Sequence, residues 1–173
     1  IGYQIEDPMF RFNTDIMEGY LARLYFWVGD WTKAAEYAGT VLGRHPLISG
    51  NAYTEMLASE ITPKGNILIK GGRISDSSSS MQYSGVKSNL EGRPVSKRFV
   101  DTFIEKEADI RYSLSFNRKR VNQKNVFACM RSAEMQLILA ESLYHSGDKP
   151  GALAALNELR RNRIDAVTDY TME

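Results

Sequence analysis

Apolar residues recur at helical spacing in residues 14–42, and a Gly-Asp pair divides this stretch into two parts. The apolar positions of the first part are Ile16, Tyr20, Leu24 and Trp27. Spacings of three and four residues place such side chains on one face of a helix. Gly29 suits a left-handed helix end, and Asp30 or Thr32 can cap the helix that follows. The pattern therefore predicts a helical hairpin over 13–42.

A second stretch, residues 130–164, has the same organisation. Its apolar positions are Met135, Ile138, Leu139 and Leu143, followed by Leu153, Leu156 and Leu159. The two parts meet at Gly147-Asp148, and Pro150 suits the first turn of the new helix because its missing amide hydrogen is not needed there. We predict a second helical hairpin over 129–164.

The two hairpins are related by an internal repeat. One shift of the sequence aligns Leu21 with Leu139, Ala22 with Ala140, Gly29 with Gly147, Asp30 with Asp148 and Ala34 with Ala152. Paired helices of about 34 residues with small residues between them are typical of tetratricopeptide-like arrays, whose units stack on their neighbours. Residues 43–128 separate the two hairpins, so we interpret this stretch as an insert.

The insert is predicted to be rich in loops. Residues 66–70, NILIK, lie between glycines and predict a short strand. We expect this strand to belong to one short hairpin of strand within the insert. Ser96 is placed to cap a short helix that begins near Arg98. The fold class expected is mainly α, with two helical hairpins flanking an insert that contains little β structure.

Composition limits the classes of function. The 173 residues, 43% of them hydrophobic, fit a single globular domain over 1–173. The net charge is +1, which does not favour a nucleic acid or an anionic membrane as partner. Cys129 is the sole cysteine and His45 and His145 are the two histidines, so we expect no metal site and no cofactor.

Several chemically suggestive groups have simpler structural interpretations. Trp27 and Trp31 are predicted to pack in the core, and the six basic residues between Arg111 and Arg131 are predicted to lie on a solvated loop. Arg160, Arg161 and Arg163 suit the negative end of a helix dipole. The carboxylates Glu105, Glu107 and Asp109 have no evident acid or base partner, and the chain has no serine nucleophile elbow. We expect no enzymatic activity.

Four segments together resemble the SusD/RagB family of Bacteroidetes surface lipoproteins. They are YLARLYFWVGDWTKAAEYAGTVL at 20–42, GNILIK at 65–70, GRPVSKRFVDTF at 92–103 with DIR at 109–111, and MRSAEMQLILAESLYHSGDKPGALAALNELRRNRI at 130–164. Their order is similar to that of the family's C-terminal portion. The resemblance implies that the chain is a fragment of a longer protein, and that Asp109-Ile110-Arg111 forms a structural ion pair.

The loop after the predicted strand carries the candidate ligand-binding residues. Sugar recognition uses an exposed aromatic ring together with polar groups that hydrogen-bond hydroxyls, and loops often display both. The candidates are Tyr83 as the leading residue, with Arg73, Asp76, Gln82, Asn89 and Tyr53. The alternative, that Tyr83 covers a small core within the insert, stays open.

The resemblance implies a function without catalysis. We expect binding of a polysaccharide or oligosaccharide at the outer-membrane surface and its delivery to a TonB-dependent, SusC-like transporter. The membrane would be reached only through a lipid anchor that these residues do not include, and no nucleic acid is expected as partner. The alternative function is a tetratricopeptide-like scaffold that binds proteins or peptides.

Overall fold

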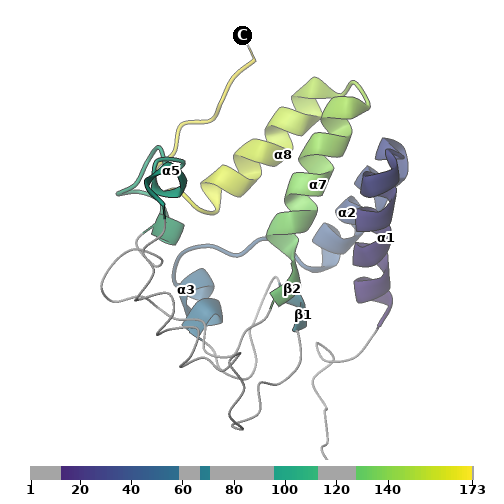
Figure 1. Ribbon diagram of the computed structural model, residues 1–173, viewed down its shortest axis with the longest axis horizontal. Coiled ribbons are helices and arrows are strands. Elements are labelled where there is room, and N and C mark those ends of the chain that lie inside the picture. Colours follow the sequence, from purple (N-terminus) through teal and green to yellow (C-terminus); the bar gives the residue numbers. More distant parts are fainter. Residues whose placement is uncertain (1–12, 59–66, 71–95, 113–127, 173) are drawn as a thin grey trace, which may run out of the picture.

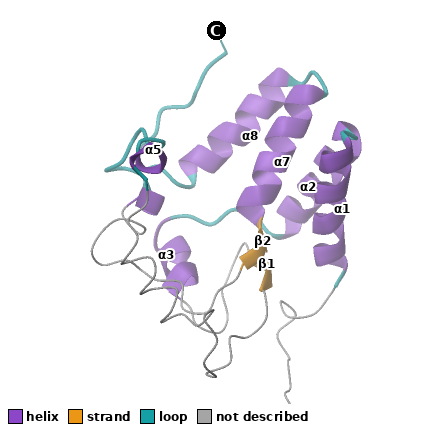
Figure 2. Cartoon of the chain, viewed as in Figure 1, coloured by secondary structure: helices purple, strands orange, loops and turns teal. Residues whose placement is uncertain are grey.

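The computed structural model describes residues 13–58, 67–70, 96–112 and 128–172. These residues are mainly helical, which confirms the predicted fold class (Figure 1, Figure 2). The elements in chain order are α1 (Thr14–Val28), α2 (Trp31–Arg44), α3 (Gly50–Ala58), β1 (Ile67–Lys70), α5 (Lys97–Val100), β2 (Ala128–Arg131), α7 (Ser132–His145) and α8 (Lys149–Arg161).

Helices α1 and α2 form the first predicted hairpin. Asn13 caps α1, and its side-chain oxygen accepts a hydrogen bond from the Ile16 amide at 3.0 Å. Gly29 ends the helix with φ of 79°, a left-handed conformation that a residue without Cβ adopts at little cost. Asp30 then caps α2 by accepting from the Lys33 amide. The cap residues expected at this turn are therefore confirmed.

Helices α7 and α8 repeat this design. Gly147 has φ of 90°, and the Asp148 side chain accepts a hydrogen bond from the Gly151 amide at 2.9 Å. Pro150 lies in the first turn of α8, as expected. The shared Gly-Asp turn thus has the same structural role in both halves of the repeat.

The two hairpins pack against each other through α2 and α7. Figure 1 shows α7 between the first hairpin and α8. Small side chains on α2 bring the two backbones close, and longer side chains on α7 fill the space between them. The buried cluster at this contact consists of Ala22, Ala34, Ala38, Val41, Met130, Met135 and Ile138. An ion pair between Arg23 of α1 and Glu134 of α7 also joins the hairpins.

The predicted strand is present as β1, and it pairs antiparallel with β2. We expected its partner within a short hairpin of strand, but the partner lies far away in sequence. The pairing extends from Ile67 opposite Arg131 to Lys70 opposite Ala128. Because Arg131 belongs to this strand, α7 begins at Ser132, whereas the predicted hairpin began at residue 129.

The prediction that Trp27 packs in the core is wrong. Its side chain is 83% exposed, and Leu24 of the predicted apolar stripe is 56% exposed. Of the predicted stripe, Ile16 is buried and Tyr20 packs against the core, and the other buried positions of α1 are Gly19 and Ala22. Trp31 does pack as expected: it stacks on His145 of α7, with ring centroids 4.3 Å apart, and meets Phe26 of α1 edge to face.

Candidate functional site

The described part of the insert joins the repeat array at the end of α8. Ser96 caps α5, as predicted, by accepting a hydrogen bond from the Phe99 amide. Further along, Asp109 forms a β-bridge with Ile164. The Ile110 amide donates to the Arg163 carbonyl at 2.9 Å within this contact. Main-chain hydrogen bonds therefore hold residues 108–110 against the chain that follows α8.

A buried ion pair stabilises this junction. Arg111 donates to both carboxylate oxygens of Asp109, with Nε to Oδ1 at 3.0 Å and Nη2 to Oδ2 at 2.6 Å. The Arg111 amide also donates to Oδ1 at 2.9 Å. The side-chain hydrogen bonds to Asp109, with the charge of its carboxylate, raise the pKa of Arg111 above its ordinary value. Asp109 is 3% exposed. The geometry is that of the structural ion pair implied by the family resemblance.

Arg163 connects the same junction to α3. Its guanidinium lies over the ring of Tyr53, 4.1 Å from the ring centroid, and donates to the Ile48 carbonyl. Burial lowers the pKa of Arg163 because the charged form has lost solvent. Both side chains are buried. This arrangement fixes α3 beside the end of α8 through a cation–π contact and a main-chain carbonyl.

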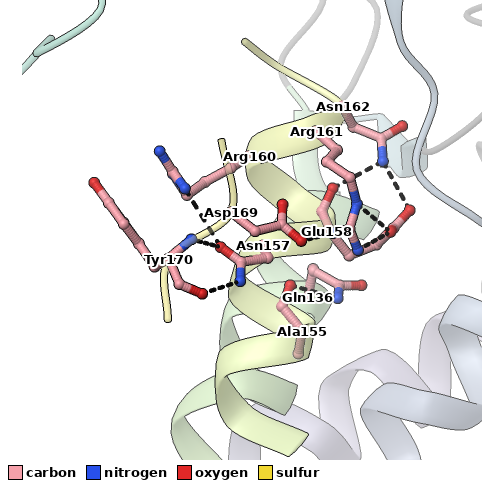
Figure 3. A network of polar contacts seen from close by, with 9 residues as sticks. All are labelled: Gln136, Ala155, Asn157, Glu158, Arg160, Arg161, Asn162, Asp169 and Tyr170. Atoms are coloured by element: carbon pink, nitrogen blue, oxygen red, sulfur yellow. Dashed lines mark hydrogen bonds and ion pairs between the residues drawn. The ribbon is translucent and has the colours of Figure 1, made fainter. Parts of the chain in front are cut away.

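Arg160 and Asn157 hold the C-terminal residues on α8 (Figure 3). The Asn157 side chain donates to the Tyr170 carbonyl and accepts from the Tyr170 amide, both at 2.9 Å. Arg160 donates to the Thr168 carbonyl at 2.8 Å, and its guanidinium lies 3.5 Å from the centroid of the Tyr170 ring. An ion pair with Glu105 at 3.4 Å links Arg160 to the insert.

Arg160 and Arg161 lie in the last turn of α8, as the helix-dipole interpretation expects, but that interpretation is incomplete for Arg160 and wrong for Arg163. Arg160 and Arg163 are buried and make specific contacts across the junction. Arg163 also lies beyond the end of α8. Arg161 is exposed, and it pairs with Glu158 of the same helix and with Asp169 (Figure 3). Tertiary contacts, which the sequence pattern of one helix does not contain, determine the positions of these side chains.

A solvent-open hollow of about 630 Å³ lies beside the junction. Its lining combines apolar and charged side chains, namely Asp101, Phe103, Ile104, Glu105, Lys106 and Glu107, together with Ala108. The carboxylates can accept hydrogen bonds from hydroxyl groups. The Phe103 ring packs against Phe99 and Tyr112, and Arg111 lies over it at 5.7 Å. Its aromatic surface is thus engaged in protein contacts.

The structure places one of the predicted ligand-binding residues. Tyr53 lies on α3, is 7% exposed, and packs under Arg163. The other five candidates, which are Arg73, Asp76, Gln82, Tyr83 and Asn89, lie outside the described residues. The basic stretch between Arg111 and Arg131 also lies mostly outside them. The assignment of these residues to ligand binding stays a prediction.

Among the described residues, no group of three or more His, Cys, Asp and Glu side chains is placed to hold a metal ion. Within the same ranges, no helix combines the length and apolar character needed to cross a bilayer. The described junction offers buried ion pairs and cation–π contacts, and these suit a structural role.

Comparison with known proteins gives a likeness of fold. No protein-family model matches the chain, and no curated protein matches it. A solved structure of a SusD-like carbohydrate binding protein from Bacteroides vulgatus superimposes with a TM-score of 0.71 at 20% sequence identity. The match covers 99% of this chain and 41% of that chain, so the present residues span less than half the length of that protein. The likeness establishes that this chain has a SusD-like fold.

Proposed function

We propose that this chain is part of a non-catalytic glycan-binding protein of the bacterial cell surface. The observation that carries the proposal is the superposition of 99% of the chain on a SusD-like carbohydrate binding protein. The four segments that resemble the SusD/RagB family also support it. In this function the protein captures a polysaccharide or oligosaccharide and passes it to a TonB-dependent, SusC-like transporter in the outer membrane.

The framework described above supports this function by fixing the ends of the candidate loop. Residues 71–95 follow β1 and precede α5, and they include Tyr83, Arg73, Asp76, Gln82 and Asn89. Strand β1 is paired with β2, and the segment that α5 begins is held through Asp109 to Ile164 in the chain that follows α8. A loop on a rigid framework is a common location for ligand-binding groups. We propose that Tyr83 stacks on a sugar ring and that its polar neighbours bind hydroxyls.

Binding to a panel of soluble polysaccharides and oligosaccharides tests the proposal. Retardation in native gels identifies ligands, and calorimetry measures affinity for each one. We expect Tyr83→Ala to weaken binding at least tenfold, and Arg73→Ala to weaken it less. Tyr144→Ala is the matched control, because Tyr144 is an exposed tyrosine of α7. Absence of saturable binding across the panel, or equal loss in the Tyr144 variant, would contradict the proposal.

A protein-binding scaffold is the second candidate function. The exposed apolar side chains of α1, including Trp27, are the observation that favours it. A scaffold would retain partner binding in Tyr83→Ala and lose it when the surface of α1 is changed. The two functions are therefore distinguished by which variant loses binding.

A further inference from the structure

Three arginines from different parts of the chain gather at the junction between the insert and the repeat array. Arg111 belongs to the insert, Arg163 follows α8, and Arg131 is the last residue of β2. Figure 1 shows β2 leading directly into α7. Arginine stays protonated in proteins, so each of the three side chains carries a full positive charge. We call these three residues the arginine cluster.

Arg163 is the buried member of the cluster, and no carboxylate among the described residues pairs with it. Its guanidinium lies over the Tyr53 ring, and its Nη1 donates to the Ile48 and Asn162 carbonyls. These partners satisfy hydrogen bonds, but none of them carries a full negative charge. A buried charge without an opposite charge beside it is costly, so this arginine would gain from a nearby anion.

One carboxylate serves the whole cluster in the described part of the chain. Burial is the largest cause that lowers the pKa of Arg163, and the positive charges of Arg111 and Arg131 lower it further, so both lie close enough to act on it. Asp109 acts in the opposite direction and is the one carboxylate with this effect. Both of its oxygens already accept hydrogen bonds from Arg111. Three positive charges and one negative charge therefore leave two positive charges in excess.

Arg131 and Arg111 form the accessible side of the cluster. Arg131 is partly exposed, whereas Met130 and Ser132 on either side of it are buried. Its side chain does not cap α7 and forms no ion pair with a described carboxylate. The Arg111 side chain is 42% exposed, and the Asp109 carboxylate occupies its Nε and Nη2 but not its Nη1. Residues 112–127, which connect Arg111 to β2, contain no acidic residue that could neutralise the cluster.

The cluster lies near the start of the candidate ligand-binding loop. Arg131 pairs with Ile67 in the strand ladder, and residues 71–95 follow Lys70 at the other end of β1. Three residue steps along a strand span about 10 Å. The loop therefore begins close to the cluster.

We propose that Arg111 and Arg131 bind the anionic substituent of an acidic glycan, a uronic acid carboxylate or a sulfate ester, while Arg163 adds positive charge from the buried side. Guanidinium groups suit such oxyanions because two parallel N–H groups can donate to two oxygens. The inference rests on the proposed glycan function and narrows it to a class of glycan. Neutral sugars would gain nothing from the excess charge.

Two pairs of polysaccharides that differ in charge test the proposal. Polygalacturonic acid is compared with its methyl ester, and dextran sulfate with dextran, by retardation in native gels and by calorimetry. We expect the acidic member of at least one pair to bind at least about tenfold more tightly than its neutral counterpart. A difference in the first pair identifies a carboxylate, and a difference in the second identifies a sulfate. Raising NaCl from about 50 mM to about 500 mM should weaken acidic binding, because salt screens partly exposed charges.

Arg131→Gln tests the cluster itself. We expect this variant to bind the acidic polysaccharide at least about tenfold more weakly, with Tm and the binding of any neutral ligand unchanged, because Arg131 is partly exposed and has no described ion-pair partner. Arg131→Lys keeps the charge but not the paired donors, so its affinity should be intermediate. Arg98→Gln is the matched control, since Arg98 is an exposed arginine of α5 outside the cluster.

Three results would overturn the proposal. The acidic and neutral members of both pairs could bind equally, or Arg131→Gln could bind like the wild type. Equal losses in Arg131→Gln and Arg98→Gln would show a general attraction of polyanions to the protein surface. Failure of the glycan function has a different pattern, because then no polysaccharide binds and both proposals fall. Neutral binding that depends on Tyr83, with no gain from charge, would leave the glycan function standing and refute the role of the cluster alone.

Discussion

Replacing Asp109 by asparagine changes one atom of a buried carboxylate and removes the charge that pairs with Arg111. The structure assigns three hydrogen bonds to this carboxylate, one from the Arg111 amide and two from its guanidinium. The asparagine oxygen can still accept from the amide, but its side-chain nitrogen is a donor that faces the guanidinium. The hydrogen bond from Nη2 is therefore lost because two donors face each other, and the bond from Nε to the retained oxygen loses the negative charge of its acceptor.

The expected loss of stability is about 2–3 kcal/mol. A hydrogen bond to a charged group contributes roughly 1.5–3 kcal/mol, and removing one partner of a buried pair costs about 3–5 kcal/mol. The Arg111 side chain is 42% exposed, so water can solvate part of its unpaired charge. This places the expected value toward the lower end of the two ranges. The side chain at position 109 is buried, so water cannot replace the hydrogen bond that is lost there.

Urea unfolding followed by circular dichroism measures this difference. Asp101→Asn is the matched control, since Asp101 pairs with Lys97 across an exposed surface. Exposed pairs contribute about 0.2–1 kcal/mol, so this variant should unfold close to the wild type. A loss below about 0.5 kcal/mol in Asp109→Asn, or equal losses in both variants, would refute the assignment of the buried pair as a principal stabiliser of the junction.

Three further tests, each with one substitution or a matched pair of substitutions, address separate parts of the fold. Gly147→Ala should destabilise the protein by about 1–2 kcal/mol because φ is 90° at this position. Gly39→Ala, within α2, should stabilise it by about 0.5–1 kcal/mol because an added Cβ meets nothing within 4 Å. Thermal unfolding should therefore show shifts of opposite sign for the two variants. Ala38→Leu should cost about 1–3 kcal/mol by overpacking the contact of α2 with α7, and a Tm equal to that of the wild type would contradict this packing. Asn157→Ala should release the residues around Tyr170 and increase their rate of proteolysis, while Asn51→Ala on the exposed surface of α3 should not.

The helical hairpins could be predicted from the sequence because their signals are local. Gly29 ends one helix, and the adjacent Asp30 caps the next. The same Gly-Asp pair recurs at Gly147 and Asp148 in the second hairpin. Capping depends on the backbone of the next three residues and not on the rest of the molecule. The strand at 67–70 had a comparable local signal, although its partner did not.

The incorrect predictions from the sequence share one physical cause, which is that contacts between distant segments determine the positions of these side chains. Periodicity shows that Trp27 lies on an apolar face, but it does not show whether another helix covers that face. Arg160 and Arg163 were interpreted as partners of the helix dipole because the local sequence does not show which residues they contact. In the structure Arg160 contacts Thr168 and Tyr170, and Arg163 donates to the Ile48 carbonyl. The buried ion pair of Asp109 was anticipated only through the family resemblance. A buried arginine gives no local sequence signal that distinguishes it from an exposed one.

The pairing of β1 with β2 and the contact of Asp109 with Ile164 also have a consequence for how this protein can evolve. Residues 71–95 and 113–127 each connect two segments whose positions these contacts fix. The entropy of closing a loop grows only with the logarithm of its length, so doubling either segment costs about 0.6 kcal/mol. Such a cost is small beside the stabilisation expected from the Asp109 pair alone. Insertions can therefore accumulate in these segments while the helical array is inherited unchanged.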